Sequence, residues 1–161
     1  MTSKKTGNSK PKTLIIYISF HHGNTIKVLN AIRPILNADL KTPSQVKESD
    51  LKNYDFIGLA SGTIYGMLHR SLLEFVDHIE LPKKKYFILT TSGMSMTKKN
   101  DSLGKAKRFL ESKGLKVVGT FGCRGWDSWG PLKLIGGIKR HHPTPDDITA
   151  AKKFAHSLLK K

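Results

Sequence analysis

Short apolar runs alternate with amphipathic segments along this chain, and this alternation constrains the fold more than any other feature. The apolar runs predict strands over 14–18, 38–41, 55–60, 86–90 and 115–121. Apolar side chains at helical spacing predict helices over 26–36, 72–79, 102–113 and 145–159. Strands that alternate with helices pair in parallel, and right-handed crossovers place the helices on both faces. We therefore expect an α/β fold, a three-layer, doubly wound sheet of five parallel strands.

Three segments interrupt this regular pattern. Pro34 lies late in the first predicted helix and should kink or end it. Residues 43–53 form a polar connection to the third strand, and residues 122–143 form a long loop that contains glycine and tryptophan. Neither segment is long enough to be a second domain.

A polar loop separates the first predicted strand from the first predicted helix. Such a loop lies at a helix N-terminus, where backbone N–H groups and the positive end of the helix dipole favour an anion. Gly23 would let the backbone approach that anion closely. The side chains that can add hydrogen bonds here are Ser19, His21, His22, Asn24 and Thr25.

The same loop lacks the residues of other phosphate-binding motifs. It has neither the Gly-Lys-Ser/Thr ending of nucleoside triphosphate loops nor the G-x-G-x-x-G dinucleotide fingerprint. No Lys or Arg falls between Leu14 and Ile26. Neutral donors at a helix end suit a monophosphate such as that of FMN. The alternative is an ordinary strand-to-helix turn in which Asn24 or Thr25 caps the helix.

At these residues the chain resembles the flavodoxin-like family, whose first loop has the form Ser/Thr-x-Ser/Thr-Gly-x-Thr after an apolar strand. The resemblance extends from about residue 12 onward and includes the stretches 119–125 and 136–143. It implies the strand order 2-1-3-4-5, with the ligand crevice beside the ends of strands 1 and 3. His22 departs from the family pattern because it replaces a hydroxyl, which would make its hydrogen bond pH-sensitive.

The resemblance also places a flavin ring between the loops after the third and fourth predicted strands. A flavin needs flat apolar walls, with backbone donors and acceptors at its polar edge. Tyr65 is the best stacking candidate, although it could instead be a surface aromatic, and Ile64 is a weaker wall. The residues assigned to one side of the ring are Ser61, Gly62, Thr63, Ile64 and Tyr65, and those assigned to the other are Thr91, Ser92, Gly93 and Met94.

The remaining reactive side chains form no catalytic pattern. We predict that Cys123 is a small residue in or near the core. We predict that His141 and His142 are a solvated pair rather than metal ligands. Trp126 and Trp129 could cover a flavin or a partner site, but packing of their loop against the sheet edge is favoured. We predict no catalytic side chain and no metal site, so the redox chemistry would be the cofactor's.

The composition is strongly basic. Lys and Arg number 28 against 12 Asp and Glu, which gives a formal net charge of +16. Residues 1–12 read as a basic, flexible tail that precedes a domain over 13–161. Basic residues also surround the predicted cofactor rim, where they would stabilise an anionic reduced flavin and attract an acidic protein. The single cysteine and the absence of a signal peptide or membrane-length apolar run predict a cytoplasmic protein that does not contact a membrane.

We therefore predict an FMN-binding, flavodoxin-like electron-transfer protein whose redox partner is acidic, either a ferredoxin-like protein or a flavoenzyme. The alternative of the same fold is an NAD(P)H-dependent FMN or quinone reductase. A nucleic-acid-binding module, with tryptophans that stack on bases, is disfavoured because the basic residues are spread over the whole chain. A receiver domain is disfavoured because Ser61 stands where that fold needs an aspartate.

Overall fold

The computed structural model describes residues 10–20, 22–93, 101–128 and 130–161. Strands and helices alternate along it as the apolar pattern predicts. The strands are β1 (Thr13–Ile18), β2 (Ala38–Lys41), β3 (Phe56–Ile64), β4 (Met67–Leu68), β5 (Lys85–Ser92) and β6 (Lys116–Arg124). The α-helices are α1 (Asn24–Leu36), α2 (Glu48–Leu51), α3 (Arg70–His78), α4 (Ser102–Ser112) and α5 (Pro145–Leu158), and the 3₁₀ helices are η1 (Pro43–Gln45) and η2 (Gly130–Ile135).

Parallel strands form the sheet in the order β2-β1-β3-β5-β6. Numbered by themselves, these strands have the order 2-1-3-4-5, so the predicted fold is confirmed. One further strand, β4, was not predicted, and it pairs antiparallel with the end of β3. It lies off the parallel path and does not change the order of the other strands.

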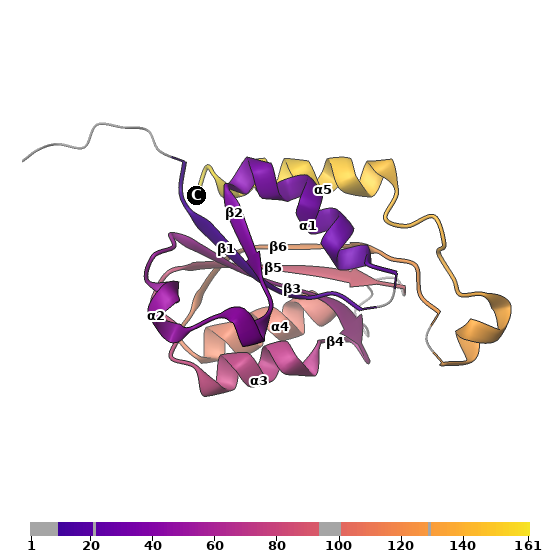
Figure 1. The fold of residues 1–161 in the computed structure, drawn as a ribbon, viewed down its shortest axis with the longest axis horizontal. Coiled ribbons are helices and arrows are strands. Elements are labelled where there is room, and N and C mark those ends of the chain that lie inside the picture. Colours follow the sequence, from indigo (N-terminus) through magenta and orange to yellow (C-terminus); the bar gives the residue numbers. More distant parts are fainter. Residues whose placement is uncertain (1–9, 21, 94–100, 129) are drawn as a thin grey trace, which may run out of the picture.

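Helices cover both faces of the sheet (Figure 1). The pair α1 and α5 lies on one face, and the pair α3 and α4 lies on the other. Successive residues of a strand point to opposite faces, so β1 contributes to both cores. Leu14 and Ile16 pack in the core under α3 and α4, and Ile15 packs in the core under α1 and α5. All three are completely buried, which fixes the register of β1.

Helix α1 begins directly after the first loop and passes through Pro34. Pro34 was predicted to kink or end the helix, and it does not end it, because the helix continues for two residues to Leu36. Pro34 lies close to the end, where its missing N–H removes only one intrahelical hydrogen bond. Asn37 ends the helix in the left-handed conformation (φ 47°), and its N–H donates to the carbonyl of Arg33. The buried apolar face of the helix consists of Val28, Leu29, Ile32 and Leu36.

Strands β3 and β5 extend beyond their predicted ends. The apolar runs stop near residues 60 and 90, but the strands continue to Ile64 and Ser92. They do so because ladder hydrogen bonds join backbone groups and require no apolar side chain. Beyond Ile64, Tyr65 and Gly66 form a two-residue turn into β4 with φ values of 50° and 70°. Positive φ at both positions is the geometry of a type I′ hairpin turn.

Residues 10–12 precede β1 without regular structure, and most of the predicted tail lies outside the described residues. The backbone N–H of Lys12 donates to Asp55 Oδ2 at 2.8 Å, which ties this segment to the start of β3. Within the described ranges, no helix combines the length and the apolar character needed to cross a membrane.

Candidate functional site

The carboxyl ends of β1, β3, β5 and β6 meet at one edge of the sheet (Figure 1). The strand registers make these ends neighbours. Ile18 of β1 pairs with Ser61 of β3, and Gly62 pairs with Thr91 of β5. The loops that follow these strands therefore begin side by side. They contain nearly all of the residues predicted to bind a cofactor.

The loop between β1 and α1 folds tightly around the start of the helix. His22 and Gly23 both have positive φ values, 57° and 64°, and Gly23 is the residue that precedes the first turn of α1. Ser19 Oγ accepts a hydrogen bond from the backbone N–H of Ile26 at 3.2 Å. The N-terminus of α1 thus faces a loop with neutral side chains. His21, the remaining predicted residue of this loop, lies outside the described residues.

A buried contact joins this loop to β5. Thr25 Oγ1 and Thr91 Oγ1 lie 2.9 Å apart, and the two residues are 1% and 4% exposed. Each hydroxyl is a hydrogen-bond partner of the other, although 66 positions separate them in the chain. The contact holds the start of α1 against the end of β5. Both threonines were predicted to contact a cofactor, but their hydroxyl groups already have a partner within the protein.

The loop after β6 closes over the first loop. The rings of His22 and Trp126 stack with centroids 3.4 Å apart and planes 12° apart. His22 Nε2 lies 2.7 Å from Ser128 Oγ, and Asn24 Nδ2 donates to the main-chain oxygen of Trp126 at 2.7 Å. The backbone N–H of Gly125 donates to the carbonyl of Ser92 at 3.0 Å. This loop therefore belongs to the site.

No spacing in the sequence signals these contacts, because more than a hundred residues separate the partners. Trp126 was expected to pack its loop onto the sheet edge. It does lie beside the sheet's carboxyl edge, but its ring stacks on the predicted phosphate loop. Trp129, for which the same packing was predicted, lies outside the described residues.

The end of β3 and the β3–β4 turn present apolar side chains to solvent. Tyr65 is 83% exposed, Ile64 is 41% exposed and nearby Phe20, whose ring contacts His69, is 58% exposed. Ser61 is completely buried. Its hydroxyl donates to the carbonyl of Gly62 at 2.8 Å and accepts from the N–H of His69 at 3.0 Å. Ser61 therefore secures the hairpin, and its own hydroxyl group has partners within the protein.

The third predicted loop is described only at its start. Thr91 and Ser92 are the last residues of β5, and Gly93 follows them. A Cβ atom on Gly93 would lie 2.3 Å from Cβ of Asp127, so this position has no space for a side chain. Met94 and the residues up to 100 lie outside the described part of the chain.

The environment of Cys123 disfavours the thiolate form of its side chain. Burial raises the pKa of the Cys123 thiol to about 12, and the negative charge of Asp147 adds to the effect. The thiol is therefore protonated at neutral pH, whereas nucleophilic attack needs the thiolate. His142 Nδ1 lies 2.7 Å from Asp147 Oδ2, so this histidine has a carboxylate partner. Within the described ranges, no cluster of His, Cys, Asp or Glu could hold a metal ion.

The chain is similar to known proteins over nearly its whole length. Residues 14–128 match a family model described as a flavodoxin domain. An uncharacterized protein of Methanocaldococcus jannaschii is 42% identical over 150 residues, which cover 92% of this chain and 99% of that protein.

Solved structures show the same fold. A flavodoxin from the domain Archaea superposes with a TM-score of 0.67 at 17% identity and covers 92% of this chain and 96% of its own. Flavodoxin 2 of Bacillus cereus superposes with a TM-score of 0.68 at 18% identity and covers 92% of this chain and 98% of its own. At these identities the likeness concerns the fold alone.

Proposed function

The chain belongs to the flavodoxin family, and from this premise we propose that it binds FMN at the carboxyl edge of its sheet and exchanges electrons with another protein. Bound FMN would supply one- and two-electron redox chemistry at its ring. The protein would bind the cofactor, orient it and shield it from water. The observation that carries the proposal is the contact between Thr25 and Thr91, which brings the first loop and the end of β5 together.

The donor set of the first loop fits a phosphate monoester. The N-terminus of α1 offers backbone N–H groups and the positive end of the helix dipole, and the described loop contains no lysine or arginine. Asn24 Oδ1 is buried without a hydrogen-bond partner, so it can accept from a ligand hydroxyl such as those of the ribityl chain. Ser19, His22 and Thr25 complete the predicted loop. We propose that backbone groups provide most of the phosphate contacts, because Thr25 Oγ1 is engaged by Thr91.

The exposed side chains after β3 fit the ring of the cofactor. Tyr65 and Ile64 are apolar surfaces at the same edge of the sheet, and a flat ring that covers them would remove that surface from water. Gly62, Thr63, Ser92 and Gly93, all half-buried, would present backbone groups to the polar edge of the ring.

The charge around this edge supports an acidic redox partner. Lys133 and Lys139 are exposed, as are Leu134 (90%) and Ile135 (66%) of the same segment. A partner with carboxylates around an apolar patch would complement this segment in both charge and polarity. Positive charge near the ring would also stabilise a reduced, anionic flavin.

Absorption spectroscopy and reconstitution test the proposal. The purified protein, or the cofactor-free protein mixed with FMN, should bind one FMN per chain with a dissociation constant at or below about one micromolar. Trp126 lies in the loop that closes over the first loop, so its fluorescence should be quenched on binding. Absence of binding at micromolar FMN would contradict the proposal. Rapid NADPH oxidation by the reconstituted protein alone would instead indicate a flavin or quinone reductase.

A Tyr65→Ala substitution tests the assignment of the ring. It should weaken FMN binding about tenfold, because the stacking surface is lost. Its effect on the free energy of unfolding should be small, because Tyr65 is 83% exposed. Tyr65→Phe should keep the affinity. Leu134→Ala removes an equally exposed apolar side chain outside the assigned ring site and should also keep it. Equal losses in Tyr65→Ala and Leu134→Ala would contradict the assignment.

A further inference from the structure

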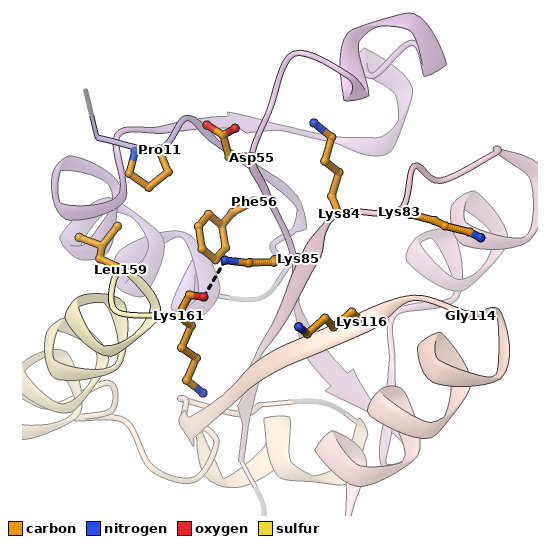
Figure 2. A pocket seen from close by; sticks show the side chains of 10 residues that line it. All are labelled: Pro11, Asp55, Phe56, Lys83, Lys84, Lys85, Gly114, Lys116, Leu159 and Lys161. Atoms are coloured by element: carbon orange, nitrogen blue, oxygen red, sulfur yellow. Dashed lines mark hydrogen bonds between the residues drawn. The ribbon is translucent and has the colours of Figure 1, made fainter. Parts of the chain in front are cut away.

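A hollow lies at the opposite edge of the sheet, where the strands begin (Figure 2). This cavity of about 710 Å³ is lined by the starts of β3, β5 and β6 and by residues near both ends of the chain. Five lysines and one carboxylate provide the charged groups of the lining: Lys83, Lys84, Lys85, Lys116, Lys161 and Asp55. We call it the lysine cavity. It shares no residue with the proposed FMN site.

The sheet register places two of these lysines directly opposite each other. Lys85, the first residue of β5, pairs with Lys116, the first residue of β6, and on its other side with Phe56 of β3. Side chains of paired residues in parallel strands project from the same face of the sheet. Like charges directly opposite in a sheet are destabilising. An anion between Lys85 and Lys116 would lower any repulsion between their charges.

No Asp or Glu side chain of the described residues pairs with a lysine of this cavity. In other parts of the described chain, Lys41, Lys107 and Lys113 each pair with an acidic side chain. The carboxylate that lines the cavity, Asp55, accepts from a backbone N–H instead.

Two ammonium groups of the cavity contact main-chain oxygens. Lys85 Nζ donates to the main-chain oxygen of Lys161 at 2.6 Å and lies 5.4 Å from the centroid of the Phe56 ring. Lys84 Nζ donates to the main-chain oxygen of Lys52 at 3.3 Å. Lys83, Lys84 and Lys116 have no Asp or Glu partner among the described ion pairs, so the cavity keeps a positive potential.

From these observations we propose that the lysine cavity binds a small anion of two or three linked phosphate groups, either free or as part of a nucleotide. Lysine is a strong phosphate ligand, and ammonium groups from two separate segments, residues 83–85 and Lys116, could contact successive phosphates. The cavity volume falls within the roughly 300–1,000 Å³ typical of small-molecule sites. Pro11, Phe56 and Leu159 form apolar parts of the lining, which could contact the base of a nucleotide.

Calorimetric titration of the full chain with tripolyphosphate tests this proposal. At an ionic strength of about 0.1 M, we expect one binding site per chain. The Lys85→Gln/Lys116→Gln variant should bind at least about tenfold more weakly, because two charges at the centre of the cavity are lost. Lys105→Gln/Lys152→Gln removes the same charge from exposed lysines outside the cavity and should change the affinity less than about twofold.

Two further measurements keep the test decisive. Lys116 makes no hydrogen bond or ion pair among the described contacts, so the Lys116→Gln variant should fold. Lys116→Gln should weaken the binding of tripolyphosphate, and Lys116→Arg should restore it.

A parallel titration with ATP identifies the source of the phosphates: tighter binding than tripolyphosphate indicates a nucleotide, and equal binding indicates the phosphate chain alone. Equal losses in the cavity and control variants, or failure of both ligands to bind at millimolar concentration, would overturn the proposal. Binding of random oligonucleotides without binding of either phosphate ligand would overturn it too.

Discussion

The polar side chains at the two edges of the sheet differ in the partners that they contact. At the carboxyl edge, neutral side chains engage one another, as in the 2.9 Å contact between the hydroxyl groups of Thr25 and Thr91. At the amino edge, Lys85 and Lys116 lie opposite each other, and neither forms an ion pair with an Asp or Glu side chain of the described residues. One edge is held together by hydrogen bonds between its loops, and the other contains lysines without an Asp or Glu partner.

This difference indicates what each edge would recognise. With its side chains engaged, the carboxyl edge would contact a ligand mainly through backbone groups and exposed apolar surface, so its function should depend on close packing. The amino edge would contact a ligand through charge, so its function should depend on ionic strength and on the number of lysines. Steric substitutions should therefore damage the first edge, and charge substitutions the second.

Gly125→Ala should have the largest effect, because it crowds the loop that closes the carboxyl edge. A Cβ atom on Gly125 would lie 2.6 Å from Asn24 Nδ2 and 3.0 Å from Asn24 Cβ, and Asn24 is only 7% exposed. We expect a loss of about 1–3 kcal/mol in the free energy of unfolding, as is typical of overpacking. FMN binding should weaken by about tenfold or more, because Asn24 begins α1. Urea denaturation and FMN titration measure the two effects.

A double-mutant cycle identifies the cause. Asn24→Ala removes the obstructing side chain, so Asn24→Ala/Gly125→Ala should be less destabilised than the sum of the single variants. Gly62→Ala is the matched control, since its Cβ would lie 3.8 Å from the nearest atom, the main-chain oxygen of Thr91. Additive effects, or an equal cost at Gly62, would show that close packing of this loop is not what matters.

Asp147→Asn should have an intermediate effect, which depends on pH. Burial raises the pKa of Asp147, but hydrogen bonds from Thr144 N, His142 and Thr144 Oγ1 outweigh burial and lower it below the ordinary value. A carboxyl group whose pKa is lowered on folding stabilises the fold above its ordinary pKa, and this stability is lost as the pH falls through the folded-state value. At pH 7 we expect the substitution to cost about 1 kcal/mol, the usual value of a helix cap.

Urea denaturation at pH 7 and below pH 4 tests this prediction. The difference between wild type and Asp147→Asn should shrink at the lower pH, where the carboxyl group of the wild type begins to be protonated. Asp146→Asn is the control, because Asp146 is exposed in the same first turn of α5 and makes none of these contacts. A difference that is unchanged at low pH, or an equal cost at Asp146, would show that the carboxylate contacts do not provide the stability.

The alternation of apolar runs and helical patterns was enough to predict the fold, because this information is local. A buried run such as 14–18 needs helices on both sides of its sheet, whatever the rest of the chain does. The strand ends could not be predicted in the same way. β3 continues to Ile64 and turns back at Tyr65 because backbone pairing with β4 stabilises it, and pairing depends on residues outside the run.

The loops of the candidate site could be predicted, but the contacts between them could not. Ser19 to Thr25 could be read as one loop because they are consecutive. The stack of His22 on Trp126 joins residues that are far apart in the sequence, so it depends on how the loop after β6 folds back. The Lys85–Lys116 pair depends on the register between β5 and β6, which shifts between Tyr86 and Phe87. No local pattern contains such a register.

Lys116→Gln should have the smallest effect on stability. Whether the substitution raises or lowers the melting temperature tests the difference between the two edges. In the absence of added phosphate, removing one of two opposed lysines should leave the protein as stable as wild type or raise its melting temperature by about 1–3 °C. Any gain should disappear at about 1 M salt, where the charges are screened. Lys113→Gln is the control, because Lys113 pairs with Asp77 and its loss should not stabilise the fold. A clear loss of stability in Lys116→Gln, measured by circular dichroism at low salt, would mean that Lys116 has a compensating partner. The amino edge would then not be the uncompensated one.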